Sequence, residues 1–189
     1  ELEDELAEPL ERLREGEKGI QPLHWQLAFP DVFSRNHPGF NAFVGNPPFL
    51  GGTRISEVMG EGYFDYLVNT FSGCKHHCDL VAYFLRKGYR LSCQKGTTSF
   101  ITTNTVGQGD TREGGLAPLL AEGGCIYSAT KRKSWPGVAA VVVSVVHIIK
   151  ACTITPARLG GAFTRRISAY LSEGDVDDSP QRLASNPYF

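Results

Sequence analysis

The longest apolar run of the 189-residue chain, residues 138–149, is rich in β-branched side chains and predicts a buried β-strand. Ser144 and His147 interrupt this run, and it is far shorter than the roughly 20 residues that span a bilayer. We therefore interpret His147 as a structural histidine of the strand and expect no membrane-spanning segment. With 41% hydrophobic residues and a net charge of -1, the composition also excludes a disordered chain.

Predicted strands and helices alternate along the rest of the chain. Short apolar or β-branched runs predict strands at 40–44, 97–103 and 125–129. Apolar residues at helical spacing predict helices at 78–93 and 112–121. The segment 50–76 favours neither a strand nor a helix. The order strand, helix, strand, helix, strand, strand predicts an α/β sheet that is largely parallel, with its last strands antiparallel.

Charge is segregated along the chain. Residues 1–18 carry eight acids against three bases, a balance of -5, whereas residues 86–166 carry twelve bases against three acids, a balance of +9. The basic block includes the run 131–133, Lys-Arg-Lys. Such a block is typical of a protein with a polyanionic partner, although solvated loop ends have the same composition. Charge alone leaves both interpretations open.

A stiff polar turn, Asn46-Pro47-Pro48-Phe49, follows the predicted strand at 40–44. In an open α/β sheet, ligands bind beyond the carboxyl ends of the strands, where this turn would lie. The prolines lack N–H groups and hold the residues before them extended, so the turn presents carbonyl oxygens without competing donors. Asn46 adds a side-chain carbonyl and Phe49 a flat apolar face. The turn therefore suits a planar amine that donates hydrogen bonds while its ring is stacked.

Residues 39–49, Gly-Phe-Asn-Ala-Phe-Val-Gly-Asn-Pro-Pro-Phe, resemble the motif G-F-D-x-x-x-G-N-P-P-F/Y of S-adenosylmethionine-dependent adenine-N6 DNA methyltransferases. The helix, strand and aromatic loop that follow the motif in this family have similar segments at 79–84, 96–104 and 135–137. Residues 101–112 resemble segments of large bifunctional restriction–modification polypeptides. The resemblance extends over about residues 24–150. It implies the catalytic, C-terminal half of a Rossmann-like methyltransferase sheet, with S-adenosylmethionine as cofactor and double-stranded DNA as partner.

The resemblance also implies a mechanism, in which an adenine is flipped out of the DNA and methylated directly at N6. It assigns the catalytic role to the turn, Asn46, Pro47, Pro48 and Phe49. The Asn46 side-chain oxygen and the Pro47 carbonyl would accept the two N6 hydrogens. Phe49 would stack on the flipped base.

Further ligand contacts follow from the same resemblance. Trp135 would stack on the flipped base or wall it from another side, and Pro48 and Phe84 would pack against the adenine of the cofactor. Arg112, after the glycine-containing loop 107–110, is a candidate contact to a DNA phosphate. That loop follows a predicted strand but lacks the third glycine of a dinucleotide fingerprint, so a purely structural role is equally open.

The segment Cys74-Lys75-His76-His77-Cys78 brings two thiols and two imidazoles together. Two cysteines separated by three residues can bind zinc, but no second pair of ligands follows at zinc-finger distance. We therefore expect a loop without a metal. The five cysteines of the chain are scattered and odd in number, which favours a reducing compartment over a disulfide scaffold. The resemblance implies a cytoplasmic protein of a bacterium or archaeon.

Three regions are expected from these patterns: an acidic helical leader at 1–23, the catalytic part at 24–155, and a hairpin with a polar tail at 156–189. The leader has leucines at helical spacing, interrupted by Pro9. The glycine-rich cofactor loop of the family has no counterpart before residue 40. We therefore expect the chain to be part of a longer polypeptide that also holds the cofactor-binding half and a target-recognition domain, and to be inactive alone.

Two other functions remain open from the sequence. One is a non-catalytic DNA-binding or interaction module on a methyltransferase scaffold, which would explain the missing cofactor loop. The other is methylation of a protein glutamine, because a side-chain amide is also a planar nitrogen donor. The basic block and the likeness of residues 101–112 favour DNA methylation.

Overall fold

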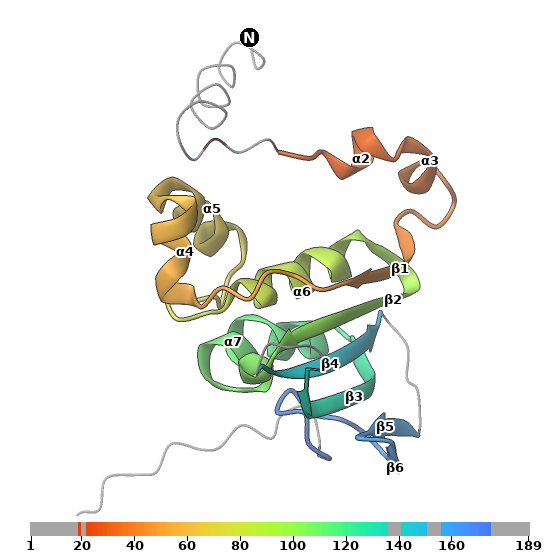
Figure 1. Cartoon of the computed structure of the whole chain (residues 1–189). Coiled ribbons are helices and arrows are strands. Elements are labelled where there is room, and N and C mark those ends of the chain that lie inside the picture. Colours follow the sequence, from red (N-terminus) through yellow and green to blue (C-terminus); the bar gives the residue numbers. More distant parts are fainter. Residues whose placement is uncertain (1–18, 20–21, 136–140, 151–155, 175–189) are drawn as a thin grey trace, which may run out of the picture.

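A mixed six-stranded sheet, in the order β1-β2-β4-β3-β5-β6, forms the centre of the structure (Figure 1). The structure is a computed structural model that describes residues 19, 22–135, 141–150 and 156–174. The expected acidic leader up to residue 18 and the polar tail from residue 175 lie outside the described residues. The strands are β1 (Phe40–Gly45), β2 (Ser92–Thr103), β3 (Cys125–Ser134), β4 (Val142–Ile149), β5 (Ala157–Leu159) and β6 (Ala162–Thr164).

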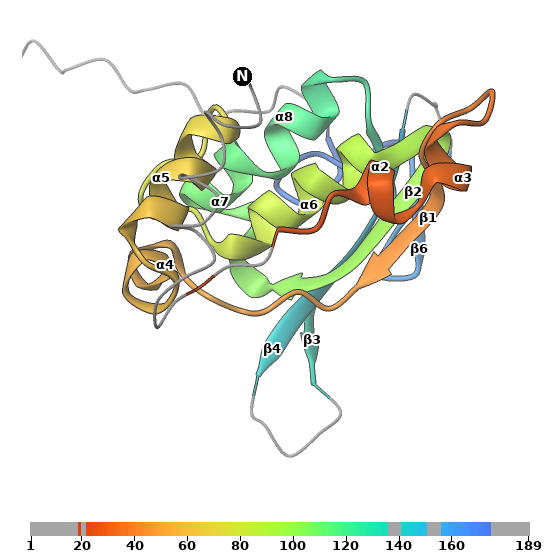
Figure 2. The same cartoon turned by 90° about the horizontal axis from the view of Figure 1, so that it is seen from above.

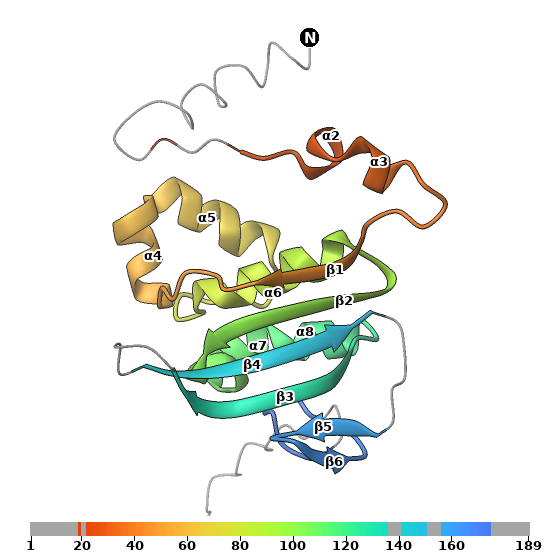
Figure 3. The same cartoon turned by 45° about the vertical axis from the view of Figure 1, so that its right-hand side comes forward.

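The strand directions differ in one respect from the expectation. The pairs β1–β2 and β3–β5 are parallel, whereas β2–β4, β3–β4 and β5–β6 are antiparallel. The expectation of a largely parallel sheet is therefore wrong, and that of antiparallel last strands is confirmed. The reason is that β3 and β4 are joined by a short connection, which permits a hairpin but no parallel crossover. As a result β4 folds back and lies between β2 and β3 (Figure 3).

Helices cover one face of this sheet (Figure 2). They are α2 (Trp25–Ala28), α3 (Pro30–Phe33), α4 (Gly52–Met59), α5 (Glu61–Thr70), α6 (Leu80–Leu91), the 3₁₀ turn η1 (Asn104–Gly107), α7 (Gly109–Gly114) and α8 (Leu116–Ala121). The ambiguous segment 50–76 thus contains α4 and α5. The helix expected at 78–93 is shorter, because Asp79 caps its start and β2 begins at Ser92. The helix expected at 112–121 is divided at Gly115 into α7 and α8.

Helix α6 is buried on two sides. Towards the sheet, its Val81 and Leu85 belong to the main core, together with Phe100 of β2 and Ile148 of β4. Away from that core, its side chains join a second apolar cluster with α4 and α5, whose members include Ile55, Phe64, Leu67, Leu80 and Tyr83. The helix is therefore held from both directions, and its first turn has a defined place relative to the sheet. No helix in the described ranges is long and apolar enough to cross a membrane.

His147 lies half-buried in β4, as the sequence predicts for a structural histidine. Its Nδ1 is 2.9 Å from Oγ of Ser99 on β2, and the ring of Tyr127 on β3 lies 5.7 Å away between centroids. Burial lowers the pKa of His147, because the charged imidazolium loses hydration in this position.

The lowered pKa of His147 predicts a specific acid sensitivity of the fold. The unfolded chain takes up this proton near pH 6.5 and the folded chain only at lower pH, so the free energy of unfolding decreases as the pH falls below about 6.5. Replacement by glutamine (His147→Gln) should reduce this decrease, as measured by urea unfolding between pH 5 and 8. Equal pH profiles of wild type and His147→Gln would contradict the prediction.

Candidate functional site

Three segments that are distant in the sequence meet at the carboxyl ends of β1 and β2. Because β1 and β2 are parallel, the chain crosses back between them, and α6 starts at the edge of the sheet where both strands end. The segment 46–53 leaves β1 at this edge, residues 77–79 lead into α6, and residues 104–111 leave β2. This is the edge at which open α/β sheets bind ligands.

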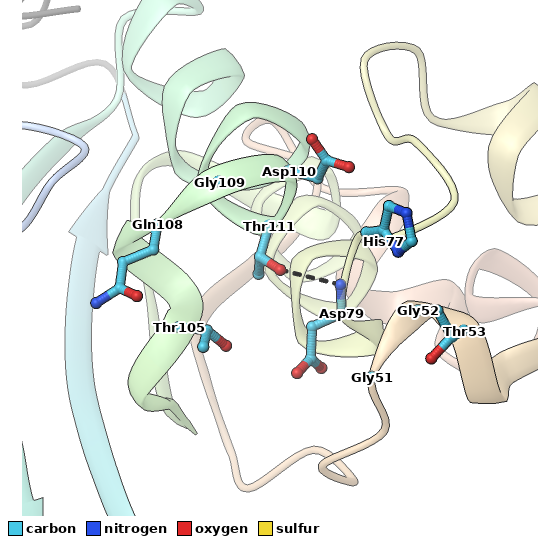
Figure 4. A pocket seen from close by; sticks show the side chains of 10 residues that line it. All are labelled: Gly51, Gly52, Thr53, His77, Asp79, Thr105, Gln108, Gly109, Asp110 and Thr111. Atoms are coloured by element: carbon cyan, nitrogen blue, oxygen red, sulfur yellow. Dashed lines mark hydrogen bonds between the residues drawn. The ribbon is translucent and has the colours of Figure 1, made fainter. Parts of the chain in front are cut away.

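A cavity of about 490 Å³ lies between these three segments (Figure 4). This volume falls within the range of about 300–1,000 Å³ that is typical of small-molecule sites. Asp79 and Thr105 point toward the same space beside Gly51, whereas Gln108 and Asp110 extend to the outside (Figure 4). The lining residues are Gly51, Gly52, Thr53, His77, Asp79, Thr105, Gln108, Gly109, Asp110 and Thr111.

The predicted catalytic turn leads directly into this cavity. Asn46 is exposed, and its side-chain amide makes no hydrogen bond within the described residues. Pro47 is buried, Pro48 is exposed, and the side chain of Phe49 is 39% exposed. Gly51, two residues after Phe49, already lines the cavity. The amide and the aromatic ring of the turn are therefore both available to a ligand at this edge.

The exit of the turn is fixed to the start of α6. The N–H of Leu80 donates to the carbonyl of Leu50 over 2.9 Å. Gly52 lies against the backbone of the loop that leads into α6, since a Cβ at this position would clash with the carbonyl oxygens of His76 and Cys78. Only a residue without a side chain permits this approach.

The loop before α6 is in turn bound to α7. Nζ of Lys75 lies 2.9 Å from Oε2 of Glu113 and 3.9 Å from Oδ1 of Asp110, and Sγ of Cys74 donates to the carbonyl of Gly114 over 3.5 Å. A hydrogen bond from the Cys78 thiol and the charge of the nearby Arg86 lower the pKa of Cys74 to about 7. The hydrogen bond to Cys74 and burial together raise the pKa of the Cys78 thiol.

The described part of the chain has no group of three or more His, Cys, Asp or Glu side chains placed to hold a metal ion. In the segment 74–78, both cysteines are buried and in the thiol form. The Cys74 thiol donates to the carbonyl of Gly114 and the Cys78 thiol to that of Asp79, so the segment packs as a loop between α5 and α6.

Phe84 and Trp135, the other predicted ligand contacts, belong to elements other than the turn. Phe84 is 40% exposed on α6 and lines a groove of about 150 Å³ with side chains of α5, among them Tyr63 and Tyr66. Trp135 is half-buried directly after β3, where its backbone N–H donates to the carbonyl of Val141 over 2.9 Å. The structure thus gives the predicted residues separate places around one edge of the sheet.

Arg112, the predicted contact to a DNA phosphate, is buried among protein groups. Its residue is 8% exposed, its guanidinium lies 4.2 Å from the ring centroid of Tyr170, and one guanidinium nitrogen is 3.6 Å from Oε1 of Glu113. The structural interpretation of this residue therefore fits the geometry better than the DNA contact. The sequence did not indicate Thr105 and Thr111 as lining residues of the cavity, because their residue type and spacing carry no functional signal.

The fold can be compared with that of known proteins. A Type IIL restriction–modification enzyme, MmeI, solved in complex with DNA, matches 75% of this chain with a TM-score of 0.61 and 23% identity. At this identity the likeness shows the fold alone. The chain spans 21% of the length of the MmeI chain.

The sequence profile of the Eco57I restriction-modification methylase family matches residues 2–115, more than half of the chain. The chain belongs to this family. A comparison with curated proteins finds no match.

Substitutions of two neighbouring glycines test how closely the residues after the turn pack against the loop before α6. Gly52→Ala should lower the free energy of unfolding by about 1–3 kcal/mol, the usual cost of an overpacked position. Gly51→Ala is the matched control, because a Cβ at Gly51 has no atom within 4 Å, and its effect should stay within about 0.5 kcal/mol. Urea unfolding measures both, and similar values for the two variants would contradict the packing described here.

Proposed function

We propose that this protein transfers a methyl group from S-adenosylmethionine to N6 of an adenine that is flipped out of double-stranded DNA, in a restriction–modification system of a bacterium or archaeon. The observation that carries the proposal is the exposed amide of Asn46 at the carboxyl end of β1, which has no hydrogen-bond partner among the described residues. An exposed Phe49 and an open cavity follow it. Family membership supports DNA methylation as the reaction. The proposed place of action is the cytoplasm, where the DNA is.

The turn would act on the exocyclic amine of the base. The Asn46 side-chain oxygen and the Pro47 carbonyl accept the two N6 hydrogens, which draws the nitrogen lone pair out of conjugation with the ring. The nitrogen becomes a better nucleophile, and the proton leaves after the nitrogen has become cationic, so no strong base is required. Phe49 stacks on the base, an interaction worth about 1–3 kcal/mol per base in nucleic-acid binding.

The described residues fit one end of the proposed cofactor. Phe84 and its groove present aromatic faces that suit a flat adenine ring, and Pro48 is exposed on the turn. When bound, S-adenosylmethionine supplies an electrophilic methyl group on a sulfonium sulfur. In this proposal Phe84 and Pro48 hold the adenine of the cofactor, while Asn46 and Phe49 hold the base.

The hairpin of β3 and β4 provides the surface that supports DNA as partner. The last paired residues of the hairpin are Ser134 on β3 and Val142 on β4. They lie beyond Val143, which pairs with Thr103 at the carboxyl end of β2, so the hairpin projects past the site (Figure 2). Lys131, Arg132 and Lys133 are exposed on β3, and Trp135 follows them. Cations beside a site for a flipped base suit the phosphate backbone. The DNA contact that the sequence suggested for Arg112 is replaced by this surface.

The central prediction concerns Asn46. Asn46→Ala should reduce methyl transfer about 10²-fold or more, the loss that follows removal of one stabilising hydrogen bond from a transition state. The assay follows labelled methyl groups from S-adenosylmethionine into DNA with the complete protein encoded by the gene. Asn69→Ala, an exposed asparagine on α5, is the matched control and should keep full activity. Normal transfer by Asn46→Ala would reject the mechanism, and label in protein instead of DNA would favour glutamine methylation.

The hairpin surface predicts a salt-dependent contribution to DNA binding. Lys133→Gln should weaken binding equally for all sequences and reduce the slope of log K against log salt by about 1, because one phosphate contact is lost. Lys95→Gln removes an exposed lysine at the start of β2, the opposite end of the sheet, and should leave the slope unchanged. Fluorescence anisotropy with duplex DNA between 50 and 200 mM salt measures both. Equal slopes for wild type and Lys133→Gln would exclude the hairpin as a DNA surface.

A further inference from the structure

Asp79 is a buried acid at the centre of the edge where the three segments meet. The residue is 6% exposed and serves as the N-cap of α6, where its Oδ1 accepts from the N–H of Val81 over 3.1 Å. Its carboxylate also accepts from the Thr103 hydroxyl at the end of β2. Burial raises the pKa of Asp79, and these two hydrogen bonds oppose the shift because they stabilise the charged form.

The backbone of Asp79 binds a third element. Its N–H donates to Oγ1 of Thr111 on α7 over 3.1 Å (Figure 4). The Thr105 hydroxyl donates to Oγ1 of Thr103 over 3.1 Å, which extends the connection along the segment that leaves β2. We call Asp79, Thr103, Thr105 and Thr111 the Asp79 network. It joins α6, the end of β2 and α7.

The next residue links this network to the turn. Leu80 donates its N–H to Leu50, directly after Phe49, so the direction of the first turn of α6 sets where the exit of the turn lies. The donor is one of the first N–H groups of the helix, which have no partner within the helix itself. The position of the cap therefore determines the position of this donor.

We propose that Asp79 is a positioning residue for the turn Asn46–Phe49: by capping α6 and binding the end of β2, it places the Leu80 N–H that holds the exit of the turn. The inference rests on the proposed function and adds a residue to it. Asp79 acts through other groups, because its carboxylate is already engaged by Val81 and Thr103. Although Asp79 lines the cavity, the proposed role needs no contact between its carboxylate and the ligand.

The test compares two replacements of Asp79 in the complete protein. Asparagine retains a side-chain oxygen that caps a helix and alanine does not. Asp79→Ala should speed amide hydrogen–deuterium exchange at residues 46–53 and at Leu80 about tenfold or more, and Asp79→Asn should restore protection. With S-adenosylmethionine and DNA, Asp79→Ala should lower kcat about 10- to 10²-fold with little change in KM for DNA, as expected for a small misplacement of reacting groups. Asp65→Asn, an exposed acid on α5, is the control and should change neither readout.

Each outcome decides the proposal. Unchanged exchange at residues 46–53 in folded Asp79→Ala overturns it, and so does a loss of kcat without a change in exchange, which would assign Asp79 a direct role. If Asp79→Ala does not fold, Thr111→Val replaces it, since it removes one hydrogen bond of the network, and Thr111→Ser must restore protection. Absence of methyl transfer by the wild type would reject the proposed function, whereas the exchange experiment would still test the positioning role.

Discussion

The parallel pairing of β1 with β2 is the constraint on which the rest of the site depends. Two parallel strands require a crossover, and the helix that completes it must start at the edge where both strands end. This requirement brings the turn after β1, the cap of α6 and the loop after β2 to one place. The packing of α6 between the main core and the cluster of α4 and α5 then makes this meeting point rigid.

Polar groups at the start of α6 form hydrogen bonds with other protein groups. A carboxylate as buried as that of Asp79 is costly unless hydrogen bonds compensate it, and the helix N-terminus provides such a bond through Val81. The same capping geometry leaves the N–H of Leu80 free for the carbonyl of Leu50. The interactions that stabilise the start of α6 are thus the interactions that hold the turn, whereas the Asn46 amide has no partner in the part of the chain that the structure describes. Rigidity around an open hydrogen-bonding group is what a site for a polar ligand requires.

Local patterns predicted the strands and the turn, because these features depend on neighbours in the sequence. The apolar run at 40–44 became β1, and the β-branched run at 97–103 became the second half of β2. The first half of β2 was missed, since Ser92 and Cys93 continue the helical pattern of α6. The sequence also did not predict that β4 lies between β2 and β3. Whether a strand takes an edge or a central position in the sheet depends on pairing partners far away in the chain.

The sequence by itself determined the chemistry of the turn: the type of each residue, the stiffness imposed by two prolines, and the family to which the chain belongs. Only the tertiary structure decided which side chains surround that turn. Arg112 looked available from the sequence and is buried against Tyr170, while Asp79 and Thr111 showed no sign of their shared hydrogen bond. The physical reason is that burial and hydrogen bonding are properties of the distances between segments, which are set when α6 and α7 pack on the sheet and which no stretch of neighbouring residues encodes.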